Sequence, residues 1–126
     1  MRAILQDGPG EPEKLYLGDA PEPSCGPGEV RIAVHTTAVN RADVLQRSGL
    51  YAPPPGTTSI LGLEAAGVVV ELGADAASWL RVGQRVMALL PGGGYAEQVV
   101  VLSTQVMPIP DELSDEEAAA LPEVFL

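Results

Sequence analysis

The sequence predicts a mostly β fold, a barrel or sandwich of short strands with short helices. Its 14 glycines and 12 prolines are spaced along the chain in clusters typical of turns, such as PPPG at residues 53–56. Between these turns lie short runs rich in Val, Ile and Leu, and many short strands joined by Gly/Pro turns are typical of barrels and sandwiches. With 126 residues, the chain has room for one domain with its own core.

Four runs predict strands. Residues 29–39 (EVRIAVHTTAV) alternate apolar and polar side chains over much of their length, which indicates a strand with one buried face. Residues 67–71 (GVVVE) and 85–90 (RVMALL) are shorter and more continuously apolar, and residues 95–102 (YAEQVVVL) complete the series. Short apolar runs bounded by turn signals are consistent with buried strands.

Two short helices are expected. Asn40 is suited to cap the first helix, which should end near Gly49. Ser114 and Glu117 have the spacing of a capping box ahead of residues 118–121, so Ser114 would cap the second helix and Glu117 would reach back.

Composition narrows the function classes. A net charge of −10, with seven basic residues spread along the chain, argues against binding a nucleic-acid backbone. No apolar run approaches the roughly 20 residues of a membrane span, and the N-terminus does not resemble a secretory signal. The single cysteine, Cys25, excludes an internal disulfide and a cysteine-based zinc site. These features favour a cytoplasmic protein without nucleic-acid or membrane partners.

Five segments together resemble one known family. They are NRAD at residues 40–43, GLYAPPP at 49–55, LGLEAAGVVVELG at 61–73, VGQRV at 82–86 and GGGYAE at 92–97. Their order resembles the N-terminal, GroES-like catalytic domain of the medium-chain dehydrogenase/reductase superfamily, and within it the zinc-free quinone oxidoreductase branch. The resemblance implies a GroES-like β-barrel with short helices over residues 1–126.

The resemblance also implies a Rossmann domain in the full-length enzyme, which this chain lacks. The triplet at residues 92–94 does not have the G-x-G-x-x-G spacing of a dinucleotide site, and it leads into a predicted strand rather than a helix. The chain ends on two large apolar residues, Phe125 and Leu126, just after a helix start. The sequence therefore predicts a truncated chain, folded but inactive by itself.

Departures from the zinc-dependent members predict that no metal is bound. Those enzymes carry a zinc-binding His where this chain has Leu63, and a Cys ligand where it has Asn40. A side chain of Leu has no lone pair to donate, and a neutral amide is a poor zinc ligand. Ala42 replaces a proton-relaying hydroxyl, and the four-cysteine structural lobe that should follow residues 82–86 is missing.

The resemblance suggests roles for particular side chains. Asn40 would line the pocket beside the nicotinamide and the substrate carbonyl, although it could serve only as a helix cap. Arg41 would reach the cofactor pyrophosphate unless it is simply solvated. Asp43 would bond to backbone or to the cofactor ribose. Tyr51 would stack on a flat acceptor and bond to its carbonyl, or merely anchor its loop. Glu64 could be a retained pocket residue, but it is expected to be structural, as a partner of a backbone N–H.

Three other side chains are expected to have no catalytic part. His35 lies in a predicted strand and should be packed or solvated, Cys25 lies in a turn with no base near it in sequence, and Trp79 should cover the barrel or anchor a loop. The catalytic residues predicted from the resemblance are thus Asn40 and Tyr51.

The activity that the resemblance implies is NADPH-dependent quinone oxidoreduction. Hydride would pass from the nicotinamide to a quinone or an α,β-unsaturated carbonyl without zinc, chiefly through alignment of donor and acceptor. The resemblance further implies a homodimer for the full-length enzyme. Two alternatives remain: an enoyl-thioester reductase on the same scaffold, in which Tyr51 would protonate carbon, and a short non-enzymatic binding module.

Overall fold

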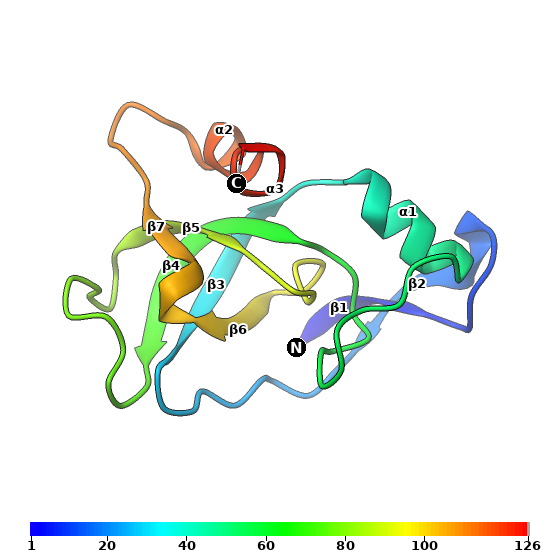
Figure 1. The fold of residues 1–126 in the computed structure, drawn as a ribbon, viewed down its shortest axis with the longest axis horizontal. Helices are drawn as coiled ribbons and strands as arrows, with labels where there is room; N and C mark the ends of the chain where they lie inside the picture. The colour runs from blue at the N-terminus through cyan, green and yellow to red at the C-terminus, as the bar shows by residue number, and fades with distance from the viewer. Residues whose placement is uncertain (126) are drawn as a thin grey trace.

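The structure, a computed structural model, describes residues 1–125 and contains two antiparallel sheets with short helices around them (Figure 1). The larger sheet has five strands in the order β6-β3-β4-β5-β7, and the smaller sheet pairs β1 with β2. A bridge between Ala3 and Ala96 joins the small sheet to the segment ahead of β6. The strands are β1 (Arg2–Gln6), β2 (Leu15–Asp19), β3 (Glu29–Thr37), β4 (Glu64–Leu72), β5 (Arg85–Leu89), β6 (Gln98–Leu102) and β7 (Val106–Pro108).

The helices are all short. Figure 1 shows α2 and α3 together near one end of the large sheet, with α1 set apart from them. The α-helices are α1 (Arg41–Ser48), α2 (Asp115–Ala119) and α3 (Pro122–Phe125), and the 3-10 turns are η1 (Pro12–Lys14) and η2 (Ser103–Gln105).

The large sheet is buried on both faces near its centre. Ala65 belongs to the main hydrophobic cluster, and its neighbour Ala66 packs with Ala118 and Ala119 of α2 in a second cluster. Consecutive residues of a strand point to opposite faces, so β4 is covered on both sides. This explains the nearly continuous apolar run in β4, which lacks the alternation of a half-exposed strand.

The predicted fold class, mostly β with short helices, is confirmed, although some strand limits move. The strand predicted at 29–39 is β3, and the run at 85–90 is β5. The strand predicted at 67–71 lies inside β4, which begins three residues earlier, at Glu64. β6 begins only at Gln98, because Glu97 and its neighbours already bond to β1: the Glu97 N–H donates to the Arg2 carbonyl.

Three strands and one helix were not predicted from the sequence. β1 and β2 form a ribbon that is largely half-exposed, with Tyr16 and Leu17 turned to solvent, so their apolar pattern is weak. β7 has only three residues. The helix α3 begins at Pro122, where a proline is tolerated because the first helical N–H has no partner within the helix.

Both predicted helices are present. α1 ends at Gly49, whose φ of 84° is the left-handed conformation that glycine adopts without strain. At α2 the capping box forms in both directions: the Glu117 N–H donates to Ser114 Oγ at 3.1 Å, and the Ser114 N–H donates to the Glu117 carboxylate at 3.3 Å.

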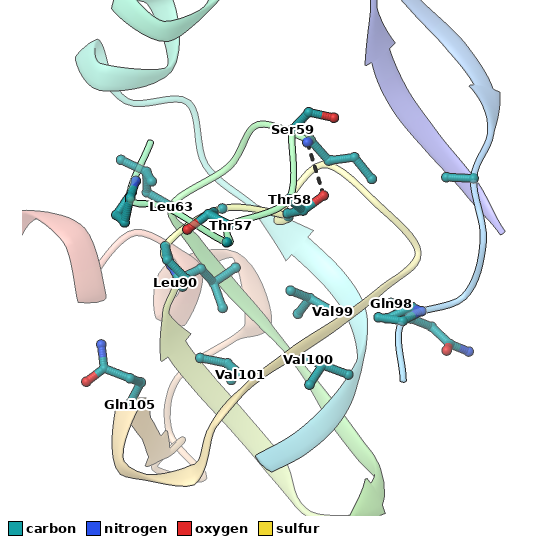
Figure 2. A pocket seen from close by; sticks show the side chains of 18 of the residues that line it. Thr57, Thr58, Ser59, Leu63, Leu90, Gln98, Val99, Val100, Val101 and Gln105 are labelled. Atoms are coloured by element: carbon teal, nitrogen blue, oxygen red, sulfur yellow. Dashed lines mark hydrogen bonds between the residues drawn. The ribbon is translucent and has the colours of Figure 1, made fainter. Parts of the chain in front are cut away.

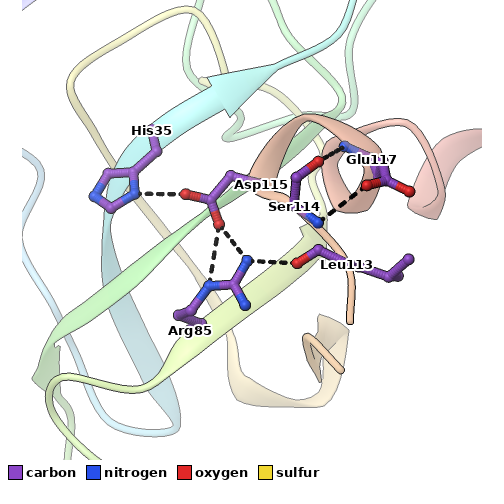
Figure 3. Close-up of polar contacts among 6 residues, drawn as sticks. All are labelled: His35, Arg85, Leu113, Ser114, Asp115 and Glu117. Carbon is purple, nitrogen blue, oxygen red and sulfur yellow. Dashed lines mark hydrogen bonds and ion pairs between the residues drawn. The ribbon is translucent and has the colours of Figure 1, made fainter. Parts of the chain in front are cut away.

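A polar cluster fixes the start of α2 to the sheet (Figure 3). Arg85 of β5 donates to Asp115 Oδ1 at 2.8 Å and to the Leu113 carbonyl at 2.8 Å. On the other side of the same carboxylate, His35 Nδ1 of β3 lies 2.9 Å from Asp115 Oδ2. His35 is therefore half-exposed and pairs with Asp115, which agrees with the expectation that it is packed or solvated.

Candidate functional site

A cavity of about 1170 Å³ lies between the proline-rich loop, the glycine turn after β5 and strand β6. Figure 2 shows the side chains of Leu63 and Leu90 with Thr57 at one end of it, and the β6 valines along its wall. A space of this size can hold a drug-sized ligand or a flat cofactor ring with its substrate.

Residues from four separate segments line this cavity. Its lining includes Ala42, Tyr51, Leu63 and Glu123. They come from α1, the loop after it, the residue before β4, and α3, so residues as far apart in sequence as 42 and 123 line one cavity.

The close approach of two glycine-containing turns shapes this region. Gly62 has a φ of 111°, and a Cβ there would lie 2.6 Å from the Gly94 Cα. The Gly94 N–H donates to the Gly62 carbonyl at 3.1 Å, and the Tyr95 N–H donates to the Leu61 carbonyl at 2.9 Å. The LGLE and GGGY segments are thus held backbone against backbone, which only glycine permits.

The first of two buried carboxylates, Asp43, lies in the first turn of α1. Asp43 is 2% exposed, and its Oδ2 accepts hydrogen bonds from the Asn40 N–H at 2.9 Å and from the Tyr95 hydroxyl at 2.8 Å. Its other oxygen, Oδ1, is buried without a partner in the described residues. Burial, and then the hydrogen bond to the Asp43 carboxylate, raise the pKa of Tyr95 well above its usual range, so Tyr95 remains a neutral donor.

The second buried carboxylate, Glu64, is 1% exposed at the start of β4. Its Oε1 accepts from the Asn40 side-chain amide at 2.9 Å, and its Oε2 accepts from the backbone N–H of Glu123 at 2.9 Å. Two such hydrogen bonds offset much of the cost of burying the charge. The expected structural role of Glu64, as a partner of a backbone N–H, is confirmed.

Asn40 is the N-cap of α1, as predicted, and it forms a capping box with Asp43. Its amide nitrogen also bonds to Glu64, so the side chain connects the start of α1 to β4. Asn40 is not among the residues that line the cavity, and neither are Arg41 and Asp43. Their predicted pocket and cofactor roles stay predictions.

Tyr51 and Arg41 are the predicted site residues that are exposed. Tyr51 is 39% exposed, lines the large cavity and also borders a smaller recess with Leu5 and Tyr16. Its hydroxyl has no hydrogen-bond partner among the described residues 1–125, so it is available to a ligand in the cavity that Tyr51 lines. Arg41 begins α1 and is solvent-exposed.

Three positions that the resemblance compares with zinc-dependent enzymes can be placed in this structure. Leu63 and Ala42 line the cavity, and Asn40 is bonded to Glu64, the residue after Leu63. Among residues 1–125, no three His, Cys, Asp or Glu side chains are grouped so that they could hold a metal ion. The described residues that line the cavity include carboxylates and amides but no Cys or His, the ligands usual for zinc.

A sequence model of the alcohol dehydrogenase GroES-like domain matches residues 26–111. The chain belongs to this family. The domain family is found in oxidoreductases of the medium-chain dehydrogenase/reductase superfamily, as the segments from NRAD to GGGYAE predicted.

Relatives of this GroES-like domain include proteins of several descriptions. The synaptic vesicle membrane protein VAT-1 homolog of Rattus norvegicus is 38% identical over 123 residues, which cover 96% of this chain and 30% of that protein. The pikromycin polyketide synthase component PikAII of Streptomyces venezuelae is 41% identical over 122 residues, covering 97% of this chain and 3% of that protein. The chain thus spans less than a third of the length of these relatives.

Solved structures show the same fold. The crystal structure of Escherichia coli quinone oxidoreductase complexed with NADPH matches with a TM-score of 0.85 at 28% identity, covering 95% of this chain and 36% of that chain. Within residues 1–125, no helix has the length and apolar character needed to cross a bilayer.

Sequence reasoning missed two residues of the site, Tyr95 and Glu123. Tyr95 follows the glycine triplet, and its sequence pattern predicts only the start of a strand. An aromatic hydroxyl beside a glycine-rich turn is the signal that could indicate a buried hydrogen bond. Glu123 follows Pro122 with no distinguishing pattern, and only the fold brings it to the cavity.

Proposed function

We propose that this GroES-like domain is the substrate-side domain of an NADPH-dependent oxidoreductase that reduces a quinone or an α,β-unsaturated carbonyl without zinc. The observation that carries the proposal is a cavity whose lining includes Tyr51, Ala42 and Leu63, an aromatic ring with its hydroxyl and two alkyl side chains. The likeness to the NADPH complex of a quinone oxidoreductase supports the choice of cofactor and acceptor.

The residues around α1 fit an anionic cofactor in part. Arg41 is exposed and makes no ion pair within residues 1–125, so its guanidinium is available to a diphosphate group. The rest of the domain is strongly acidic, so most of the cofactor would have to be held by another domain. NADPH, when bound, would supply the hydride.

The domain's own residues orient the acceptor and exclude water. The Tyr51 ring offers a flat face for stacking, and its hydroxyl can donate to a carbonyl oxygen. Leu63 and Ala42 add an apolar surface that binds neither water nor a metal ion. Exclusion of water from the site favours hydride transfer to the acceptor. Asn40, fixed by Glu64, holds the start of α1 and hence Arg41 in place.

The proposal is tested with the protein encoded by the complete reading frame. We expect NADPH oxidation with a small quinone such as benzoquinone, and no oxidation above background with the isolated 126-residue chain. NADPH binding without reduction of any quinone or enone by the complete protein would refute the oxidoreductase proposal and favour a binding module.

An enoyl-thioester reductase is the second candidate. The identity of 41% to PikAII, a polyketide synthase component, is the observation that favours it, and Tyr51 would then protonate the substrate carbon. The same assay separates the two: turnover of a 2-enoyl thioester far faster than of any quinone would favour this candidate.

A further inference from the structure

We propose that Glu123 is a further catalytic residue, which donates a proton from its carboxyl group to the carbonyl oxygen of the acceptor in the large cavity. This inference rests on the proposed function. It assigns an acid to a reaction for which sequence reasoning required none.

The placement of Glu123 is fixed by its backbone. Pro122 is fully buried at the first position of α3, and the Glu123 N–H donates to the buried Glu64 carboxylate at 2.9 Å. Glu123 is among the residues that line the cavity, as are Leu63 and Tyr51. An acid held in this way needs little reorganisation when an acceptor binds.

The charges around Glu123 favour its neutral form. Glu64 faces it from β4 and Asp43 from α1, and both are buried anions. The basic residue on β5, the other strand packed against α3, is Arg85, which is already bonded to Asp115. Burial, and then the repulsion of Glu64 and Asp43, raise the pKa of Glu123. A neutral carboxyl group can donate a hydrogen bond, whereas a carboxylate can only accept one.

Reduction of an enone consumes one hydride and one proton. The hydride forms the new C–H bond at the β-carbon, the alkene electron pair moves toward the carbonyl carbon, and the carbonyl electron pair moves to oxygen. The Glu123 O–H bond breaks as its proton binds that oxygen, and the remaining carboxylate regains a proton from water. The enol then rearranges to the saturated ketone in solvent, whereas a quinone leaves as its hydroquinone. Stabilising charge that develops on oxygen is the usual task of such an acid.

The test compares Glu123→Gln with Glu123→Asp in the protein from the complete reading frame. We expect kcat with an enone to fall on the order of 10²-fold in Glu123→Gln, with KM changed much less, and to recover in part in Glu123→Asp. Because the acid must be protonated, kcat/KM of the unsubstituted protein should fall as pH rises through the pKa of Glu123, and Glu123→Gln should lack that fall. Glu116→Gln, on the exposed side of α2, serves as the matched control and should keep the normal rate and pH profile.

A second readout needs no turnover. Glutamate carboxyl carbons of the unsubstituted protein can be labelled and followed by ¹³C NMR. The signal that disappears in Glu123→Gln belongs to Glu123, and the one that disappears in Glu116→Gln belongs to Glu116. We expect the Glu123 signal to titrate at the higher pH. Enone reduction by Glu123→Gln with an unchanged rate and pH profile would overturn this inference and leave the proposed function intact. No reduction of any acceptor by the unsubstituted protein would overturn the proposed function and this inference with it.

Discussion

Asp43 and Tyr95 show how single side chains stabilise the site. The Asp43 carboxylate is buried, and the Tyr95 hydroxyl and the Asn40 N–H are its two hydrogen-bond donors in the described residues. Hydrogen bonds to a charged group contribute about 1.5–3 kcal/mol each, and a buried carboxylate without donors is strongly unfavourable. The site is thus a network in which Asn40 joins both carboxylates, one through its backbone and the other through its side chain.

Tyr51 is the residue that separates the two reductase candidates. If it stacks and donates one hydrogen bond, Tyr51→Phe keeps the ring and loses about 0.5–1.5 kcal/mol, so kcat/KM for a quinone should fall roughly tenfold or less. Steady-state kinetics of the complete protein check this. Tyr16→Phe, an exposed tyrosine on β2, is the matched control.

A larger loss would assign Tyr51 a different role. An obligatory proton donor should lose on the order of 10²–10⁴-fold, and that loss is expected only with an enoyl thioester. A decrease beyond about a hundredfold with quinone, in protein that stays folded and binds NADPH normally, would contradict the stacking role.

At the scale of elements, the contact between α2 and the sheet determines where the end of the chain lies. α2 has only five residues, so helix propensity alone cannot stabilise it. Its stability must come from the capping box, from the packing of Ala118 and Ala119 in the second core cluster, and from the contacts of Asp115 with Arg85 and His35. Because α3 follows α2 after two residues, the same contacts position Glu123 at the cavity.

Asp115→Asn should reduce the free energy of unfolding by about 0.5–1 kcal/mol at pH 7, since it removes one charge from a partly exposed ion pair. The hydrogen bonds from His35 and then Arg85 lower the pKa of Asp115. A lowered carboxyl pKa gives stability that is complete above the unfolded value of about 3.9 and is lost as pH falls through the folded value.

Urea unfolding at pH 7 and at about pH 3 measures this difference. We expect the gap between Asp115→Asn and the unsubstituted chain to shrink at the lower pH. Asp111→Asn, in the exposed turn before α2, should change stability little at either pH. A gap that is equal at both pH values would show that the charge of Asp115 does not contribute.

At the scale of the whole molecule, the chain is one GroES-like domain that spans about 30% of its VAT-1 homolog relative. The described residues that line its cavity include no Lys or Arg, and the domain as a whole is acidic. A dinucleotide would therefore need backbone N–H groups or positive charge from elsewhere in the active protein.

Metal content is the prediction that belongs to this scale. With Leu63 and Asn40 at the positions of zinc ligands, protein purified without added metal should contain far less than one equivalent of zinc. Elemental analysis of the complete protein, with a zinc-dependent alcohol dehydrogenase measured alongside, checks this. One tightly bound zinc per chain would overturn the zinc-free proposal.

Much of the fold could be predicted because its signals are local. The alternation in β3, the glycine that ends α1 and the capping box of α2 each depend on residues that are neighbours along the chain. β1, β2 and β7 carried no comparable signal, since a half-exposed ribbon and a three-residue strand are defined by their partners.

The sequence by itself determined the β class and the two capped helices, because side-chain chemistry and short-range spacing are local properties of the chain. The absence of zinc ligands at Leu63 and Asn40 is a prediction from the family resemblance. Only the tertiary structure decided that Asn40 bonds to Glu64, that Tyr95 bonds to Asp43 and that Glu123 reaches the cavity. These contacts join residues 24 to 59 positions apart, so they exist only after sheet pairing has brought distant segments together. The acid that we assign to the site is therefore a product of the fold.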